Sequence, residues 1–260
     1  MIDIHTHILP GIDDGAADWE AALAMARAAA AEGITTIIAT PHHASGSWRN
    51  PADGVRQLTG ELQERLDGEG IAVQVRPGQE IRVHGELFEA WDRGELLTLG
   101  DTSYILIELP FTDIPAGMPE LIHELRVLGL RPIIAHPERN APIMKQPQRL
   151  SELIEAGAWG QVTAASLLGG FGKRCQESAW TLSRSGLIHI VSSDAHHIER
   201  RGFRMREAYD EIERQLGTPW KDYFLSNAEA VAADGPFAEA PSIPSSNNNI
   251  WDKITRIFRK

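Results

Sequence analysis

Histidines and acidic residues follow several short apolar runs of this 260-residue chain. His5-Thr6-His7 ends the first run, and Asp194-Ala195-His196 ends the last. Because side chains two residues apart on a strand point the same way, each pair can direct two ligand atoms at one point. A single pair of this kind is more often part of a surface turn. Two pairs of equal spacing, on the first and last strands, favour a chelating site.

Further polar residues interrupt the intervening apolar runs, namely His42, Glu80, Glu108 and His136. For any one of them, a buried ion pair or a hydrogen-bonded core histidine is the default explanation, because an unpaired buried charge is costly. As a set they supply imidazole nitrogens and carboxylate oxygens, which suit Mn²⁺, Fe or Zn²⁺. More than four ligands indicate more than one metal. Metals about 3.5–4 Å apart can activate water for phosphoryl transfer.

The runs that carry these residues predict seven buried parallel strands. The predicted strands are 2–7, 34–42, 71–81, 104–109, 131–136, 160–163 and 187–193, and the predicted helices are 18–32, 54–67, 85–94, 119–128, 147–155, 172–184 and 203–216. Strands and helices alternate, and no G-x-G-x-x-G follows the first strand to favour a nucleotide-binding sheet. We therefore expect an α/β fold, a TIM-like barrel of seven strands with its site at their carboxyl ends.

The composition excludes several classes of protein. With 25 basic and 36 acidic residues the net charge is −11, and the basic residues form no stripe, which argues against a nucleic-acid partner. The single Cys175 excludes an internal disulfide and fits a reducing compartment. Apolar runs fall short of the ~20 residues that span a bilayer, and no signal peptide is evident. We expect a cytoplasmic protein.

The chain is expected to form one domain over residues 1–234, followed by a flexible linker at 235–249 that is rich in Pro, Ser and Asn. Residues 250–260 combine an apolar stripe with four basic residues, which predicts a basic amphipathic tail. Such a tail can lie on the anionic inner face of the membrane. Docking on the barrel or on a neighbouring subunit is at least as consistent with the pattern. The oligomeric state stays open.

Seven motifs together resemble the bacterial tyrosine-protein phosphatases of the polymerase-and-histidinol-phosphatase (PHP) superfamily, over about residues 1–234. The motifs are Met1-Ile-Asp-Ile-His-Thr-His-Ile-Leu-Pro-Gly-Ile-Asp-Asp-Gly15, Ala39-Thr-Pro-His-His43, Gly78-Gln-Glu80, Ile107-Glu-Leu-Pro110, Ala135-His-Pro-Glu-Arg139, Gln161-Val-Thr-Ala-Ala-Ser-Leu-Leu-Gly-Gly-Phe-Gly172 and Ser192-Ser-Asp-Ala-His196. The His-x-His opening marks the superfamily, whereas Leu9-Pro-Gly-Ile-Asp-Asp-Gly15 and Val162-Thr-Ala-Ala-Ser-Leu-Leu-Gly169 point to the tyrosine-phosphatase branch. The resemblance implies a distorted (β/α)7 barrel of the PHP type.

The resemblance also implies two to three divalent metal ions, with manganese favoured. It places His5, His7, Glu80 and Asp194 on one metal. Glu80 bridges to a second metal that Glu108 and His136 complete, and Asp14, His42 and His196 hold the third. Only the resemblance identifies Asp14, since an aspartate in such a turn is ordinarily a helix cap or turn former. His43 and His197 each adjoin an implied ligand, and both supporting and structural roles remain open for them.

Two arginines are implied to contact the substrate phosphate, Arg139 and Arg201. A planar guanidinium suits a dianionic phosphate, although solvent-exposed ion pairs are the ordinary role of such residues and Arg200 and Arg204 compete as candidates. Arg201 matches the family best, because Arg201-Gly-Phe203 has the Arg-x-Phe spacing. Cys175 lacks the Cys-x5-Arg motif of thiol phosphatases and is expected to be inert.

We therefore expect a metal-dependent protein-tyrosine phosphatase in which a metal-activated hydroxide attacks phosphorus in line. The resemblance implies that its substrate is the tail of a bacterial tyrosine kinase controlling capsule or exopolysaccharide export. One alternative is a PHP-type small-molecule phosphomonoesterase, such as one acting on histidinol phosphate. Another is a catalytically silent metal-binding adaptor for kinase tails, against which the full ligand set argues.

Overall fold

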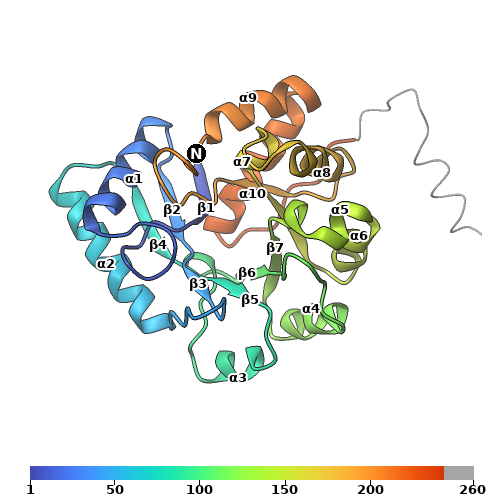
Figure 1. Ribbon diagram of the computed structural model, residues 1–260, viewed down its shortest axis with the longest axis horizontal. Helices are drawn as coiled ribbons and strands as arrows, with labels where there is room; N and C mark the ends of the chain where they lie inside the picture. Colours follow the sequence, from blue (N-terminus) through green and yellow to red (C-terminus); the bar gives the residue numbers. More distant parts are fainter. Residues whose placement is uncertain (243–260) are drawn as a thin grey trace, which may run out of the picture.

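The computed structural model describes residues 1–242, in which strands and helices alternate (Figure 1). The strands are β1 Ile2–Thr6, β2 Thr36–Ala39, β3 His42–His43, β4 Gln74–Pro77, β5 Glu80–Arg82, β6 Tyr104–Glu108, β7 Arg131–Ala135, β8 Trp159–Thr163 and β9 Ile190–Ser192. The helices are α1 Trp19–Ala31, α2 Ala52–Gly68, α3 Leu87–Asp92, α4 Met118–Val127, α5 Ala141–Lys145, α6 Gln148–Glu155, α7 Ala164–Leu167, α8 Lys173–Arg184, α9 Met205–Leu216 and α10 Thr218–Ala232, with short 3₁₀ turns η1 Leu99–Asp101 and η2 Pro137–Arg139.

The strands form two parallel sheets, with strand orders β1-β2-β4 and β3-β5-β6-β7-β8-β9. The backbone also links β1 to the residues after β9, since the His7 amide donates to the Ala195 carbonyl at 2.9 Å and the Asp194 amide donates to the His5 carbonyl at 2.9 Å. The α/β class and the parallel arrangement predicted from the sequence are therefore confirmed.

Two predicted strands differ from the prediction, because each is broken in two where the chain passes from the first sheet to the second. Thr40-Pro41 separates β2 from β3, and Pro41 has no amide hydrogen to donate to a ladder. Gly78-Gln79 separates β4 from β5. A Cβ on Gly78 would lie 2.8 Å from Cγ2 of Ile38, so the neighbouring strands approach too closely there for a larger residue.

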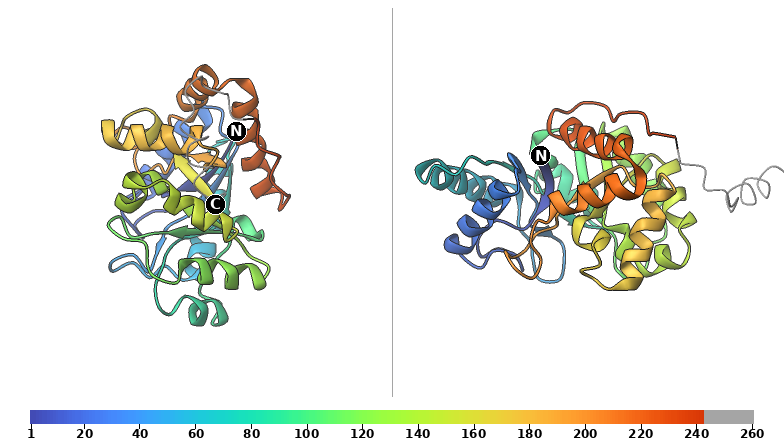
Figure 2. Two further views of the ribbon diagram at one scale, coloured as in Figure 1. Left: turned by 90° about the vertical axis from the view of Figure 1, so that its right-hand side faces the viewer. Right: turned by 90° about the horizontal axis from the view of Figure 1, so that it is seen from above.

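Apolar side chains pack on both sides of the strands. The inner cluster includes Ile4, Ile38, Leu106, Ile133 and Ile190, whereas their neighbours along the strands, such as Ile37, Ile105 and Ile134, pack with the surrounding helices. Figures 1 and 2 show these helices arranged around the strands. The inner cluster fills the amino-terminal part of the interior, which leaves the carboxyl ends of the strands for polar residues.

Helix α10 was not predicted from the sequence, and it covers the amino-terminal side of the inner cluster. Its residues Ala228 and Val231 belong to that cluster, whereas Trp220, Tyr223 and Phe224 pack with the outer one. Because α10 is buried on two sides, its apolar residues do not form the single stripe that marks an amphipathic helix. No helix within residues 1–242 is long and apolar enough to cross a membrane.

The first residues of the predicted linker follow α10 along the same side of the molecule. The Gly235 carbonyl accepts hydrogen bonds from Tyr104 Oη at 2.7 Å and from Arg131 Nη1 at 2.9 Å. The Phe237 ring stacks on Tyr104, with centroids 5.1 Å apart, and meets the edge of Trp159 at 5.2 Å. Residues 243–249 of the predicted linker and the predicted amphipathic tail at 250–260 lie outside the described residues.

Candidate functional site

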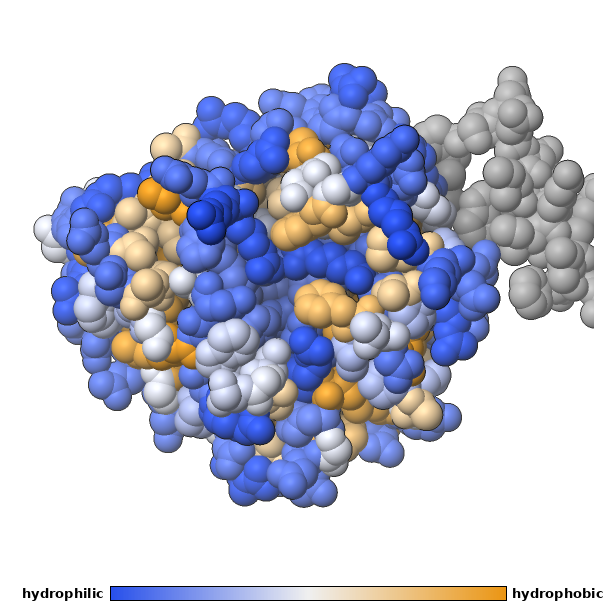
Figure 3. All heavy atoms as spheres, in the orientation of Figure 1, coloured by the Kyte–Doolittle hydropathy of each residue, from blue (hydrophilic) through white to orange (hydrophobic). Residues whose placement is uncertain are grey.

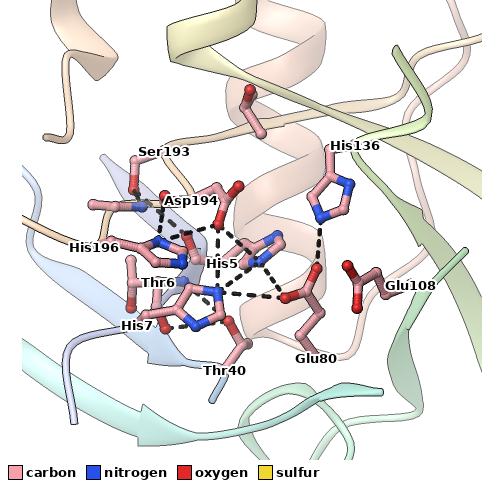
Figure 4. Close-up of polar contacts among 12 residues, drawn as sticks. His5, Thr6, His7, Thr40, Glu80, Glu108, His136, Ser193, Asp194 and His196 are labelled. Carbon is pink, nitrogen blue, oxygen red and sulfur yellow. Dashed lines mark hydrogen bonds and ion pairs between the residues drawn. The ribbon is translucent and has the colours of Figure 1, made fainter. Parts of the chain in front are cut away.

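Imidazole and carboxylate groups from seven strand ends and loops meet at the carboxyl side of the sheets. Figure 4 shows His5, His7, Glu80, Glu108, His136, Asp194 and His196 among them. Their ligand atoms form four overlapping groups in which all atoms lie within 4.8 Å of one another. The groups are His7, Asp14, His42 and His196; His5, His7 and Glu80; His5, His136 and Asp194; and His42, Glu80 and Glu108. All nine residues that the sequence suggested as ligands are thus brought together.

Glu80 occupies the middle of this cluster. Its Oε1 lies 2.6 Å from His136 Nε2, and its Oε2 lies 2.9 Å from His42 Nδ1 and 3.4 Å from His7 Nε2. Glu108 stands beside it, with Oε2 at 3.9 Å from His42 Nδ1. One carboxylate that reaches several imidazoles can bridge two cations.

Asp194 faces the same centre from the opposite side. Its Oδ1 lies 3.4 Å from His5 Nε2 and 3.3 Å from His7 Nε2. Its Oδ2 instead contacts Arg139 Nη2 at 2.7 Å and also contacts Arg201. Asp194 therefore divides its two oxygens between the histidines and the arginines.

Asp14, the residue suggested by the resemblance alone, lies at the exposed rim of the cluster. Its Oδ1 is 3.2 Å from His196 Nε2 and 3.5 Å from His42 Nε2. His196 Nδ1 lies 3.0 Å from the Asp194 carbonyl, and a proton on Nδ1 would leave the lone pair on Nε2. This third set of ligands is thus the one nearest to solvent.

Two of these residues have a left-handed backbone. The φ angle is +32° at His136 and +55° at Asp194. Side chains other than glycine pay on the order of 1 kcal/mol for such a conformation. At both strand ends this backbone conformation directs the side chain, that of His136 or of Asp194, into the cluster.

A register shift between Asp3 and Thr6 in the β1–β2 ladder also affects which way a candidate ligand points. Strict alternation would send His5 to the face opposite Ile4, which packs in the inner cluster. The irregularity lets His5 point inward as well, and its Nε2 lies 3.3 Å from that of His7.

Glu80 and Asp194 remain ionised in this environment. Burial by itself would raise the pKa of Glu80, but His5, His42 and His136 hold that pKa well below its usual value. Burial opposes ionisation of Asp194 too, yet Arg139, His5 and Arg201 lower its pKa strongly. Burial lowers the pKa of His196 to about 4, so that imidazole is neutral near pH 7. Neighbouring carboxylates, in contrast, raise the pKa values of His5, His7 and His42 although burial opposes this. Because metals bind the neutral form of imidazole, these three histidines would release protons on binding a cation.

The donor set fits divalent cations. Glu80 Oε2 and Asp194 Oδ1 are both buried, and imidazole nitrogens lie within 3.5 Å of each. None of the described residues is oriented to donate a hydrogen bond to either oxygen. A buried carboxylate oxygen without a donor is costly, and a cation bound at this point would satisfy both oxygens. The nitrogen and oxygen ligands suit Mn²⁺, Fe or Zn²⁺.

Three residues that the sequence analysis missed hold the candidate ligands in place. Asp13 Oδ2 lies 2.7 Å from His7 Nδ1, and Gln161 Oε1 lies 3.1 Å from His5 Nδ1. Arg82 binds Glu108 with both Nε and Nη2, at 2.7 and 2.9 Å. Arg82 could have been found, because it follows Glu80 by two residues and so faces the same side of β5. Asp13 could not be identified from the sequence, because the adjacent Asp14 is an equally good candidate in the same turn and nothing in the pattern distinguishes their roles.

The turn that carries Asp13 and Asp14 is pressed against the end of β1. A Cβ on Gly15 would lie 2.0 Å from the His7 carbonyl oxygen, so only glycine allows this approach.

The candidate phosphate-binding arginines both reach the cluster. Arg139 lies in η2 and Arg201 in the loop before α9, and both point at Asp194 as described above. The rival Arg204 instead pairs with Glu207 on α9, and Arg200 is exposed.

The two histidines with open roles lie apart from the four ligand groups. His43 Nδ1 contacts the Asn50 carbonyl at 3.2 Å, and its ring borders a separate cavity of about 730 Å³ with His84 and Arg49. His197 is exposed.

Cys175 is buried on α8, where its Sγ lies 3.4 Å from Ser166 Oγ. Burial raises the pKa of its thiol, which disfavours the reactive thiolate. We expect Cys175→Ser to leave the rate of phosphate-ester hydrolysis nearly unchanged, as measured with a phosphotyrosine peptide. A collapse of this rate in a variant with a native circular dichroism spectrum would instead indicate a thiol mechanism.

The face of the molecule that Figure 1 presents is hollowed at its centre (Figure 3). Hydrophilic residues form the floor of the hollow, and hydrophobic patches border it. A polar recess with apolar edges suits a substrate that combines a charged group with an apolar one.

Comparison with known proteins places the chain among bacterial phosphatases. It is 42% identical to the tyrosine-protein phosphatase YwqE of Bacillus subtilis, across 96% of this chain and 99% of YwqE. It is 35% identical to the putative tyrosine-protein phosphatase CapC of Staphylococcus aureus, across 89% and 91% of the two chains. Identity to the tyrosine-protein phosphatase CpsB of Streptococcus pneumoniae is 28%, across 90% and 99%.

Solved structures agree with this placement. A structure from the work on YwqE and CpsB, described as unique metal-dependent tyrosine phosphatases, superposes with a TM-score of 0.90 at 42% identity, covering 95% of this chain and all of the other. An organophosphorus hydrolase variant from Deinococcus radiodurans shares the fold at a TM-score of 0.57 and 17% identity, covering 88% and 92%. The family of capsular polysaccharide synthesis proteins, CpsB/CapC, matches residues 1–233. The chain belongs to the CpsB/CapC family.

Proposed function

We propose that the protein is a metal-dependent protein-tyrosine phosphatase. The observation that carries this proposal is the convergence of nine imidazole and carboxylate residues, two of which, Glu80 and Asp194, each have a buried oxygen that accepts no hydrogen bond from the described residues. The relatives support the choice of reaction, since YwqE and CpsB are named tyrosine-protein phosphatases. The substrate we propose is the phosphotyrosine-bearing tail of a bacterial kinase that controls polysaccharide export, in keeping with a capsule-synthesis family.

The proposal includes a distorted (β/α)7 barrel of the PHP type as the framework. The hydrogen bonds between β1 and the residues after β9 support it, because they join the first strand to the last. The passage of two chain segments from one sheet to the other supports it as well, since β2 with β3 and β4 with β5 then count as two bent strands.

The proposed ligands would hold two to three divalent ions. The resemblance implies three sets: His5, His7, Glu80 and Asp194; Glu80, Glu108 and His136; and Asp14, His42 and His196. The contacts of Asp194 with His5 and His7, of Glu80 with His136, and of Asp14 with His196 support parts of these sets. Glu108 is grouped by distance with His42 and Glu80 instead of with His136. Such ions, with manganese favoured, act as Lewis acids that activate water and neutralise phosphoryl oxygens.

The protein's own groups would bind and orient the phosphate. Arg139 and Arg201 approach the cluster from one side, and each can turn from Asp194 Oδ2 to a phosphoryl oxygen once a cation shares the charge of that carboxylate. Arg82 is a third guanidinium beside the cluster. It pairs with Glu108, and it could likewise turn to a phosphoryl oxygen if a cation shared the charge of Glu108. Asp13 and Gln161 would fix the ring orientations of His7 and His5.

We expect Arg201→Lys to reduce turnover of a phosphotyrosine peptide by about tenfold or more, because an ammonium cannot form the two parallel bonds of a guanidinium. Arg139→Lys should have a similar effect. Arg204→Lys is the matched control, since Arg204 pairs with Glu207 on the surface. Lysine variants of Arg139 and Arg201 with the wild-type rate would mean that neither guanidinium binds the substrate phosphate.

Substrate profiling tests the proposed substrate class. The metal-loaded protein should hydrolyse a phosphotyrosine peptide with a much higher kcat/KM than histidinol phosphate. A preference for histidinol phosphate would favour the small-molecule phosphomonoesterase, and failure to hydrolyse any aryl phosphate would favour a silent adaptor.

We further propose a cytoplasmic location, on the ground that a single, buried cysteine suits a reducing compartment. The proposed kinase tail would be met there. Peripheral contact with the inner face of the membrane depends on the predicted tail at 250–260, and liposome co-sedimentation of the full chain against a 1–238 truncation would test it. This truncation retains Gly235 and Phe237, which pack on the domain.

A further inference from the structure

Large hydrophobic side chains are exposed around the candidate site. Within residues 1–242 the exposed examples are Phe111 at 45%, Phe171 at 40% and Ile198 at 54%, together with Val127 and Leu128 on the opposite side. The first three lie on loops that follow the carboxyl ends of the strands, which carry the candidate ligands. Exposed phenyl rings beside a polar site are available to contact a ligand, and their contacts with site residues decide whether they do so.

Phe111 extends the cluster on the side of β6. Its ring stacks on His136, with centroids 5.8 Å apart and an interplanar angle of 22°, and the Arg82 guanidinium lies 5.6 Å from its centroid. The loop that carries it is fixed, because the Phe111 carbonyl accepts from the Ala141 amide at 2.7 Å and Asn140 Nδ2 donates to the Pro110 carbonyl at 2.7 Å. A ring on a fixed loop is preorganised for binding.

Phe171 occupies the corresponding place beside the arginines. The guanidinium carbons of Arg139 and Arg201 lie 4.0 and 5.6 Å from its ring centroid. Its turn is also closed by backbone hydrogen bonds, from the Gly172 amide to the Gly169 carbonyl at 3.0 Å and from the Gly170 amide to the Ala165 carbonyl at 2.7 Å. Phe171 thus lies next to both groups proposed to bind phosphate.

His136 and Arg139 belong to one short turn, and the two phenyl rings contact this turn through different residues. Phe111 contacts His136, whereas Phe171 contacts Arg139. A phosphate held by the cluster and the arginines therefore has a phenyl ring near each end of that turn. The organic group esterified to such a phosphate would therefore lie close to these two rings as it extends from the recess toward solvent.

We propose that Phe111 and Phe171 form an aryl-binding subsite that contacts the phenol ring of the substrate. The assignment deepens the proposed phosphotyrosine phosphatase function and rests on it. Aromatic rings prefer offset or edge-to-face contacts with one another, and a flexible alkyl group such as that of phosphoserine gains less from the same surface. The two rings would therefore favour aryl over alkyl phosphate esters.

Binding of two phosphonates to the metal-loaded protein tests the subsite without requiring catalysis. Phenylphosphonate and methylphosphonate carry the same charged group, and only the first carries a ring. Calorimetry should show tighter binding of phenylphosphonate by the wild-type protein. Phe111→Ala and Phe171→Ala should each reduce this preference by about threefold to tenfold. Phe111→Tyr should restore it, because it returns an aromatic ring.

Val127→Ala is the matched control, because Val127 is 73% exposed at the end of α4, away from the strand ends that carry the ligands. An unchanged preference in both alanine variants, or equal loss of affinity for the two phosphonates, would overturn the proposal. A wild-type protein that prefers phenylphosphonate but does not hydrolyse a phosphotyrosine peptide would retain the aryl subsite and contradict only the proposed function.

Discussion

Asp194→Asn should reduce the turnover of a phosphotyrosine peptide by at least about a hundredfold, because changes to groups that merely support a metal ligand already cost about 10–100-fold. The asparagine keeps the shape of the side chain and removes its charge. Oδ1 of Asp194 lies within 3.4 Å of Nε2 of both His5 and His7, and Oδ2 contacts Arg139 and Arg201. The variant would therefore lose a metal ligand and the partner of both arginines together.

The measurement is kcat with saturating peptide, together with the metal content of the purified variant. Asp210→Asn is the matched control, since the Asp210 side chain is 69% exposed on α9 and pairs with Lys221 on α10. A variant at position 194 with near wild-type turnover and undiminished metal would contradict the assignment of this residue.

The second large effect is expected for Glu80→Gln. The carboxylate lies within 3.5 Å of ring nitrogens of His5, His7, His42 and His136, so its loss weakens two of the four ligand groups at once. We expect at least about a hundredfold loss of turnover and loss of bound metal. Because a ligand that binds only the folded state raises stability, added Mn²⁺ should also raise the Tm of this variant less than that of the wild type.

Glu152→Gln provides the control for Glu80, because the Glu152 side chain is 57% exposed on α6 and forms a surface pair with Arg149. Its turnover and its Mn²⁺-dependent rise in Tm should match those of the wild type. A Glu80→Gln variant that still shows the full rise in Tm would indicate that the metals bind elsewhere.

Much of the site could be predicted because its residues lie at strand ends. There, polar side chains two residues apart, or single polar residues within an apolar run, stand out in the sequence. His5 with His7 and Asp194 with His196 are visible in this way, and Glu80 and Glu108 interrupt apolar runs. Asp14 could not be found from periodicity, because it lies in an irregular turn whose path depends on the contact of Gly15 with His7. The pairing of Arg82 with Glu108 depends on the spacing of two neighbouring strands.

The alternation of strands and helices predicted the α/β class, and the errors in the fold arose from tertiary packing. The breaks at Pro41 and Gly78 depend on how the two sheets meet, although both residues are known to interrupt strands. Helix α10 was not predicted because its apolar residues pack in two different clusters. They therefore do not form the single apolar stripe by which an amphipathic helix is recognised in a sequence.

The most direct test of a metal-dependent phosphatase is elemental analysis of protein purified without chelator, paired with turnover of a phosphotyrosine peptide before and after metal removal. The account predicts about two to three divalent ions per chain, loss of turnover on chelation, and recovery when Mn²⁺ is added back. Undiminished turnover by protein shown to be free of metal would contradict it.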